Sequence, residues 1–274
     1  MIKRKIIDVE VEVEHITNWI KDYFIKNGPN SKAIIGISGG KDSTIAAALL
    51  CRALGKERVV GVIMPDSVMN DFAIAKDVCG YLGIEDIVVD IGGITSVFYQ
   101  SIDDGYDKDH HIRDIPAVST NTPARIRMAV LYAIAAVKHG RVVNTCNRSE
   151  DYVGYSTKYG DLAGDFSILS SYCVREVKEI GAYLGLPDRF IYKVPSDGMC
   201  GKTDEDNLGF AYNVLDAYIL DGVYPDYDIL KNIKERHDRN LHKVHAINLP
   251  SPNAKSRHRE GETVRTGLGV LNEI

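Results

Sequence analysis

A glycine turn between two apolar runs holds the residues of this chain best suited to chemistry. Residues 33–37 are apolar and β-branched, as in a buried parallel strand, and residues 44–54 are Ala/Leu-rich and end at Gly55, as in a helix. Ser38-Gly-Gly-Lys-Asp-Ser43 stands between them. A strand, a glycine turn and a helix start present N–H groups and a positive helix end to one anion. The glycines permit close approach, the serines add hydroxyl donors, and Asp42 can hold a Mg²⁺ that bridges phosphates.

This turn is not a Walker loop, which needs Gly-x-x-x-x-Gly-Lys-Ser/Thr. Its pattern, Ser-Gly-Gly-x-Asp-Ser after an apolar strand, resembles the loop of the ATP pyrophosphatases, which cleave ATP between the α and β phosphates. In those enzymes the loop grips the leaving pyrophosphate. An ordinary glycine-rich turn is the alternative, but it would not require these specified positions between a strand and a helix, so we favour phosphate binding.

A second stretch rich in charged residues begins at the end of the expected strand 141–145. Residues 144–165 contain Glu150, Lys158, Asp161 and Asp165 among glycines and aromatic residues. A solvated loop is the simplest interpretation. The aromatic residues and glycines favour a loop that packs over a site.

A cation near a helix start adds to these candidates. Residues 121–139 predict a helix, with Asn121 or Thr122 as its cap and Pro123 in its first turn. Arg125 would then lie where a cation opposes the helix dipole, which suggests an anion beside it. Arg127 points elsewhere on the helix, and we expect it to be structural.

The order of the elements predicts how these groups are positioned. Strands alternating with helices indicate a parallel sheet with right-handed crossovers, so we expect a Rossmann-like α/β fold of three layers, α/β/α. Ligands bind at the carboxyl ends of such strands, here marked by Ser38, Pro65 and Ile91. We expect strands over 33–37, 59–65, 86–91 and 141–145, helices over 11–25, 44–54, 71–82, 121–139, 206–220 and 226–240, and an exposed loop over 103–114.

Composition narrows the class of protein. The chain has 274 residues, of which 45% are hydrophobic and 26% charged, as in an ordinary globular protein. The net charge of −5 argues against a general nucleic-acid or membrane-surface binder, but not against a local basic pocket. No run could span a bilayer, no signal region follows the charged N-terminus, and the five cysteines are scattered. We expect a cytoplasmic protein with one domain over 1–274, in which 245–274 form a flexible tail.

Together, these segments resemble the NAD⁺ synthetase family, a branch of the N-type ATP pyrophosphatases, and most closely its single-domain, ammonia-dependent members. The similarity runs from about residue 11 to 243, in the same order and at compatible spacing. It rests on Ser38–Ser43, Ala124-Arg-Ile-Arg-Met128, Asn144-Thr145, Ser149-Glu150, Gly154, Thr157-Lys-Tyr-Gly-Asp161 and Asp165. The loop alone indicates the superfamily, whereas the segment 157–161 with Ser149-Glu150 singles out this member.

The resemblance implies an adenine nucleotide alpha hydrolase-like fold and a two-step amidation. The nicotinate carboxylate of deamido-NAD⁺ attacks the α phosphate of ATP, which releases pyrophosphate, and ammonia then displaces AMP. Such catalysis depends on positioning and charge neutralisation and needs no protein nucleophile. The resemblance also implies a homodimer and a Mg²⁺ cofactor. Because the chain begins a few dozen residues before the loop, no glutamine amidase domain fits there, and we expect ammonia as the direct donor.

Residue roles are also implied by the resemblance. ATP binding falls to Gly36, Ile37, Ser38, Gly39, Gly40, Lys41, Asp42, Ser43, Thr145 and Ser196. Deamido-NAD⁺ binding falls to Arg125, Lys158, Asp165, His242 and Lys243. Asp42 and Glu150 are the implied Mg²⁺ ligands. Lys41 and Asp161 are the implied catalytic groups, Asp161 by holding ammonium or accepting its proton.

The chain departs from the family pattern at a few positions. Val174 stands where the family has a lysine that contacts ATP, and Arg175 beside it could substitute. Ile168 replaces a proline, Lys243-Val244 replaces Lys-Arg, and Lys202 replaces a glutamine. We interpret these changes as the mark of a divergent branch with the same reaction.

Other functions remain open from the sequence. A tRNA-thiolating enzyme with this loop would want paired cysteines and a basic surface, and neither is present. An enzyme forming GMP or argininosuccinate would leave the segment 157–161 unexplained. A non-catalytic nucleotide sensor would not need Asp42 and Glu150 as a metal pair. Pyrophosphate release separates the sensor from the enzymes.

Overall fold

The computed structural model describes residues 7–67, 71–106, 111–192 and 203–244. All of them belong to one compact unit, Met1–Val244. Ser196, Lys202 and the expected tail 245–274 lie outside the described residues. Within the described ranges, no helix is both long and apolar enough to cross a membrane.

Five parallel strands form the sheet in the order β3-β2-β1-β4-β5. The chain builds outward from β1 to β3, then returns to place β4 on the other side of β1, so the direction of winding switches between β1 and β4. A crevice for ligands forms at such a switch point, at the carboxyl ends of the strands. The strands are β1 (Lys32–Gly36), β2 (Val59–Ile63), β3 (Glu85–Val88), β4 (Gly140–Asn144) and β5 (Phe166–Ser167).

An apolar layer covers each face of the sheet, so its central strands are buried on both faces. Ala33 and Ile35 of β1 point into a core shared with α1, α2, α3, α7 and α8, whereas Ile34 points into a core shared with α5. This confirms the predicted three-layer fold. Its helices are α1 (Val9–Asn27), α2 (Lys41–Leu54), α3 (Phe72–Leu82), α4 (Gly92–Tyr106), α5 (Pro116–Lys138), α7 (Val174–Tyr183) and α8 (Asp188–Ile191).

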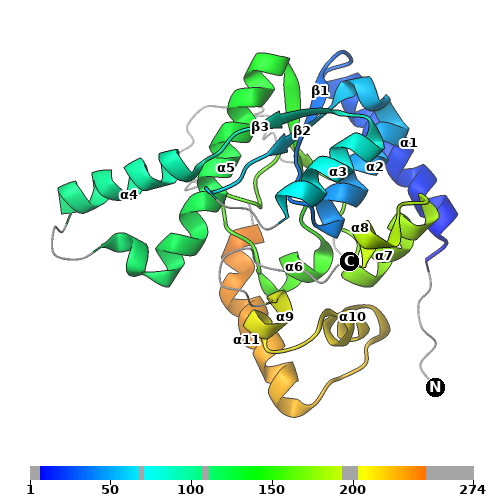
Figure 1. Cartoon of the computed structure of the whole chain (residues 1–274). Coiled ribbons are helices and arrows are strands. Elements are labelled where there is room, and N and C mark those ends of the chain that lie inside the picture. The colour runs from blue at the N-terminus through cyan, green and yellow to red at the C-terminus, as the bar shows by residue number, and fades with distance from the viewer. Residues whose placement is uncertain (1–6, 68–70, 107–110, 193–202, 245–274) are drawn as a thin grey trace, which may run out of the picture. The chain divides into compact units, whose positions relative to one another are not determined.

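A smaller core packs the remaining helices together. Val153, Leu208, Tyr212, Leu215 and Ile233 are among its buried residues. Figure 1 shows α9, α10 and α11 grouped together, near α6. This core joins α6 (Arg148–Val153), α9 (Asp204–Leu208), α10 (Tyr212–Asp221) and α11 (Tyr227–Val244).

Element boundaries differ from the sequence expectations at several places. The helix expected over 121–139 begins at Pro116, so Pro123 lies inside it and Arg125 lies in its third turn. The argument that placed Arg125 beside the positive helix end is therefore wrong. The expected loop 103–114 starts inside α4 and contains the short 3₁₀ helix Ile112–Asp114.

The C-terminal half also differs. Helices α6, α7 and α8 and the two-residue strand β5 were not expected, and the helix expected over 206–220 is divided into α9 and α10. Gly209, with a φ of 80°, ends α9 in the left-handed region.

Candidate active site

The glycine turn forms a compact loop at the head of α2. The helix begins at Lys41, so Lys41, Asp42 and Ser43 lie in its first turn. The Ser43 hydroxyl is 3.3 Å from the Ser38 nitrogen and 3.1 Å from the Gly40 carbonyl oxygen. Gly39 has a φ of 78°, and a Cβ there would lie 3.0 Å from the Asp71 carbonyl oxygen. Only glycine fits this turn without strain.

The side chains of Lys41, Asp42 and Glu150 form a charged centre beside the first turn of α2. Lys41 is 5% exposed, and its Nζ lies 2.7 Å from Asp42 Oδ2. Burial acts to lower the pKa of Lys41, but the charges of Asp42 and Glu150 outweigh it and raise that pKa. Burial, and then the Asp42 charge, raise the pKa of Glu150 far above its ordinary value. The centre therefore holds two acidic groups against one lysine.

Asn147 holds the two carboxylates together. Its side-chain nitrogen donates to Asp42 Oδ1 at 3.2 Å, and its backbone nitrogen donates to Glu150 Oε2 at 3.2 Å. The Asn147 side-chain oxygen also accepts a bond from the Glu150 backbone, which completes a capping box at the start of α6. The short helix α6 thus fixes Glu150 beside the loop.

This donor set suits Mg²⁺ bound together with phosphate. Mg²⁺ in nucleotide sites is held by one or two carboxylates and completes its octahedral shell with water and phosphate oxygens. Across the described ranges, no group of three His, Cys, Asp or Glu side chains is arranged to hold a metal ion by itself. A cation held by Asp42 and Glu150 would therefore take its remaining ligands from water or from the phosphate oxygens of the substrate. Its charge would also offset the Asp42 charge, which together with burial raises the Glu150 pKa.

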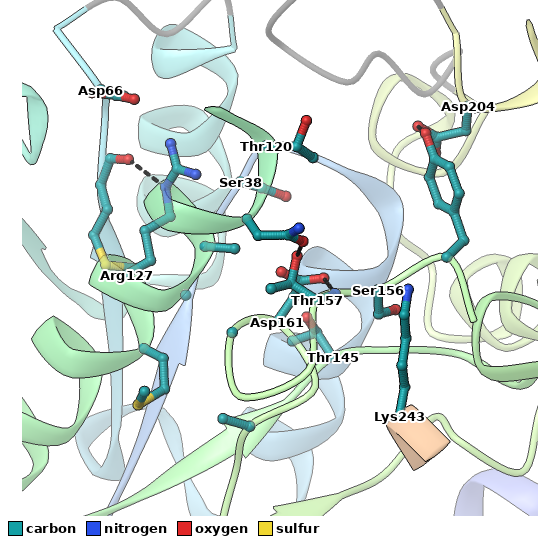
Figure 2. A pocket seen from close by; sticks show the side chains of 18 of the residues that line it. Ser38, Asp66, Thr120, Arg127, Thr145, Ser156, Thr157, Asp161, Asp204 and Lys243 are labelled. Atoms are coloured by element: carbon teal, nitrogen blue, oxygen red, sulfur yellow. Dashed lines mark hydrogen bonds between the residues drawn. The ribbon is translucent and has the colours of Figure 1, made fainter. Parts of the chain in front are cut away.

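A large cavity opens beside this centre. Its volume is about 1200 Å³, larger than the roughly 300–1000 Å³ of a pocket for one small ligand. Figure 2 shows Ser38, Thr145, Thr157, Asp161 and Lys243 around it. The cavity has room for two substrates at the predicted edge of the sheet.

The structure brings part of the predicted ATP set to this cavity. Its walls include Gly36, Ile37, Ser38, Ser43 and Thr145. Gly39, Gly40, Lys41 and Asp42 belong to the same loop, and Glu150 lies beneath it, but none of these lines the cavity.

The set predicted for the second substrate is split. Lys243 lines the cavity, whereas Arg125, Lys158, Asp165 and His242 do not. Asp161, predicted as a catalytic group, also lines the cavity. Arg125 is exposed and donates from Nε to the Lys158 carbonyl oxygen at 3.3 Å.

The end of α11 is hydrogen-bonded to the loop that follows α6. Lys243 Nζ donates to the Gly154 carbonyl oxygen at 2.8 Å, and Lys158 Nζ donates to the His242 carbonyl oxygen. A Cβ on Gly154 would lie 2.2 Å from Asn240 Cβ, so the helix approaches where only glycine fits. Burial, helped by nearby arginines, lowers the pKa of Lys243.

Asp161 lies in the loop that follows α6 and lines the cavity. Its Oδ2 accepts a bond from the Thr157 backbone nitrogen at 2.8 Å. Surrounding protein atoms raise the pKa of the carboxyl, although the Thr157 bond opposes this. The residue still reaches solvent through the cavity. A carboxylate in such surroundings can attract a small cation and accept a proton from it.

Asp165 lies instead in an aromatic patch on the surface, formed by Trp19, Tyr23, Tyr132 and Phe166. Its Oδ2 accepts a bond from the Val142 nitrogen at 2.7 Å, and its Oδ1 is 3.4 Å from the Tyr132 hydroxyl. The rings of Tyr23 and Phe166 lie 4.3 Å apart, and Trp19 stacks on Tyr23. Trp19 is 42% exposed and Tyr132 36%, so parts of both side chains reach solvent, whereas Phe166 is buried.

Sequence reasoning missed several residues of the site. Asn147 could have been found, because Asn-x-x-Glu is a capping-box pattern. Arg127 lines the cavity and donates to the Met64 carbonyl oxygen at 3.0 Å, on the opposite side of α5 from Arg125. One polar face of α11 also lines the cavity: Arg236, Arg239 and Asn240 were missed, and they lie at helical spacing with the predicted Lys243.

The chain is similar to known proteins in sequence and in fold. The family model described as NAD synthase matches residues 12–260. The NH(3)-dependent NAD(+) synthetase of Methanococcus aeolicus is 37% identical over 213 residues, which cover 76% of this chain and 82% of the relative.

Solved structures share the fold over most of their length. An NMN synthetase from Francisella tularensis matches with a TM-score of 0.80 and 31% identity, over 89% of this chain and 99% of that one. An NH3-dependent NAD synthetase from Campylobacter jejuni, solved with nitrate, matches with a TM-score of 0.70 and 29% identity, over 90% and 100%. The likeness thus extends beyond the phosphate loop to nearly the whole of these chains.

Proposed function

The chain belongs to the NAD synthase family, and from this premise we propose that it forms NAD⁺ from deamido-NAD⁺, ATP and ammonia. It is a ligase that makes a C–N bond. The supporting observation in the structure is the loop 38–43, which opens on a cavity large enough for two substrates. Ammonia as the donor agrees with the names of its relatives.

In the proposed reaction, the loop holds the phosphates of ATP. The loop and the start of α2 bind the triphosphate through N–H groups, hydroxyls and Lys41. The nicotinate carboxylate attacks the α phosphorus, and the bond to the β-phosphate oxygen breaks to release pyrophosphate. Ammonia then attacks the activated carbonyl carbon, AMP leaves and a proton is lost. The chain contributes position and charge, because no step needs a protein nucleophile.

We propose Asp42 and Glu150 as the residues that hold Mg²⁺. Their carboxylates share Asn147, and repulsion between them favours a cation. The ion would neutralise the charge that develops on the phosphates.

We also propose that Asp161 receives ammonium. Its carboxyl lines the cavity, and its raised pKa brings it closer to that of a base working near neutral pH. Transfer of a proton from ammonium to the Asp161 carboxylate would give the free ammonia that attacks the carbonyl carbon.

The second substrate would extend beyond the cavity. Arg125, Lys158, Asp165 and His242 are proposed to contact it, and the aromatic patch beside Asp165 offers aromatic side chains to a pyridine ring. We propose that the chain works as a homodimer, since α4 and α5 expose apolar residues that a second copy could cover. We also propose that it works in the cytoplasm.

Amidation of the corresponding mononucleotide is a second candidate. The observation in its favour is the Francisella NMN synthetase, whose TM-score of 0.80 exceeds the 0.70 of the Campylobacter NAD synthetase. Both reactions amidate a nicotinate carboxylate and could use the same loop.

A coupled assay tests these alternatives. The purified chain is supplied with ATP, Mg²⁺, ammonium and either deamido-NAD⁺ or nicotinate mononucleotide, and NAD⁺, NMN and pyrophosphate are measured. We expect higher kcat/KM with the dinucleotide. Preference for the mononucleotide would establish the second candidate, and no pyrophosphate with either substrate would indicate a sensor. Turnover with glutamine alone would contradict ammonia as the direct donor.

A further inference from the structure

Tyr212, the first residue of α10, reaches the charged centre from a distant part of the chain. Its ring is buried in the small core with Leu208 and Leu215, and the whole residue is 4% exposed. Lys41 Nζ lies 5.8 Å from the centroid of the ring. The side chain therefore spans from the core of the C-terminal helices to the loop that binds phosphate.

The hydroxyl of Tyr212 is buried without a partner. No hydrogen bond to it is formed within the described ranges of the chain. Burial raises its pKa strongly, and the charges of Glu150, Asp204 and Asp42 raise it further. The Tyr212 ring lies beside the Lys41 ammonium, which is itself 2.7 Å from Asp42 Oδ2, so the ring reaches the charged centre. A buried tyrosine hydroxyl normally finds a partner, and one left unpaired calls for an explanation.

The neighbouring carboxylates already have donors on their other sides. Asp42 accepts bonds from Lys41 and Asn147, and Glu150 accepts one from Asn147. Two carboxylates cannot fill an octahedral shell, so the other ligands of a bound Mg²⁺ are water or phosphate oxygens. Those oxygens need hydrogen-bond donors, and the protonated hydroxyl of Tyr212 is a donor placed beside them.

We propose that Tyr212 is a positioning residue for the magnesium–polyphosphate complex, its hydroxyl donating a hydrogen bond to a phosphate oxygen or coordinated water beside Asp42 and Glu150. This inference rests on the proposed function, because it assumes that those carboxylates hold Mg²⁺. It assigns a use to the otherwise unpaired hydroxyl.

The test compares Tyr212→Phe with wild type and with Tyr218→Phe, a matched control on the same helix. Binding of magnesium pyrophosphate and of pyrophosphate with EDTA is measured by calorimetry, and binding of Mn²⁺ alone by electron paramagnetic resonance. Thermal unfolding without ligand is measured for all three proteins.

We expect Tyr212→Phe to weaken magnesium pyrophosphate binding roughly tenfold or more, the effect of losing one hydrogen bond to a charged group. Binding with EDTA should change less than about twofold, and the unfolding midpoint should stay the same or rise, because the variant removes an unpaired buried hydroxyl. A purely structural hydroxyl would instead lower the midpoint. Weaker Mn²⁺ binding would identify coordinated water as the acceptor, and an effect with pyrophosphate only would identify a phosphate oxygen.

Two results would overturn the inference. Equal magnesium pyrophosphate affinity in Tyr212→Phe and wild type would remove Tyr212 from the centre while leaving the proposed function intact. Absence of Mg²⁺-dependent binding in wild type would refute the proposed metal site together with the inference. NAD⁺ formation, measured separately, shows whether the proposed function also fails.

Discussion

At the scale of single residues, the site depends on the balance of charge around Asp42 and Glu150. One buried lysine faces two acidic groups, and a divalent cation would favour the ionised form of both. Asn147 sets this arrangement by bonding both acids. We therefore expect the release of pyrophosphate from ATP to need both acids, and not only the loop.

Asp42→Asn and Glu150→Gln should each lower the rate of pyrophosphate release by roughly 10²–10³-fold, the range seen when one electrostatic stabiliser is removed. Both substitutions keep the shape of the side chain, so circular dichroism should match wild type. The control is Asp77→Asn on α3, a half-exposed carboxylate that pairs with Arg189. Unchanged Mg²⁺-dependent rates in the two site variants would contradict the assignment.

The raised pKa of Glu150 predicts how stability depends on pH. Because the folded protein binds this proton more tightly than the unfolded chain, the contribution is fully present below the ordinary carboxyl pKa and is lost as pH rises through the folded pKa. Without Mg²⁺, the free energy of unfolding should therefore fall on going from mildly acidic to alkaline pH.

Urea unfolding across this pH range measures the effect, with Glu150→Gln as the variant that should flatten the slope. Added magnesium pyrophosphate should protect wild type more as pH rises, since the cation needs the ionised carboxylate. A slope equally steep in Glu150→Gln would assign the pH dependence to other buried acids, such as Asp151.

At the scale of elements, the sequence predicted the first half of the fold well and the second half less well. The strands around β1 are buried on both faces, so their apolar runs are unmistakable, and α2 has glycine at both ends. The start of α5 was misplaced because Asn121-Thr-Pro123 has the composition of a helix start, although Pro116 supplies the real first turn.

The short helices α6 and α9 were missed for a different reason. Their stability comes from capping boxes and from the small core around Leu208 and Ile233, not from a long apolar period. The loop residues of the ATP site could be predicted because they are contiguous. Arg236, Arg239 and Asn240 on α11 could not, because only tertiary packing brings that helix to Gly154 and the cavity.

Gly154→Ala tests the docking of α11 on α6. Gly154 has a φ of 62°, and its added Cβ would also collide with Asn240. Gly222→Ala is a matched control, because its φ is 66° and nothing lies within 4 Å of the added Cβ. We expect the control to lose about 1 kcal/mol from the left-handed backbone alone, and Gly154→Ala about 1–3 kcal/mol more from the collision. Urea unfolding measures the difference, and equal losses would show that the collision is relieved without cost.

At the scale of the whole molecule, the proposed second substrate site points to a partner copy. The cavity contains Asp161 and Lys243, but Arg125 and Asp165 lie outside it on the surface. Exposed apolar residues on the same molecule include Val97 of α4, which is 64% exposed, and Val137 of α5, which is 73% exposed. Figure 1 shows α4 leading away from the sheet.

We therefore expect sedimentation velocity to give a dimer and Val97→Asp to shift it toward monomer, because a charge buried in an apolar interface without a partner is costly. Val11→Asp is the control, since Val11 is 57% exposed but lies on α1, which covers the opposite face of the sheet from α5. If the second site is shared between copies, the monomeric variant should bind ATP normally and lose affinity for deamido-NAD⁺. A monomer with unchanged affinity for both substrates would place the whole site in one chain, and a dimer unaffected by Val97→Asp would move the interface away from α4.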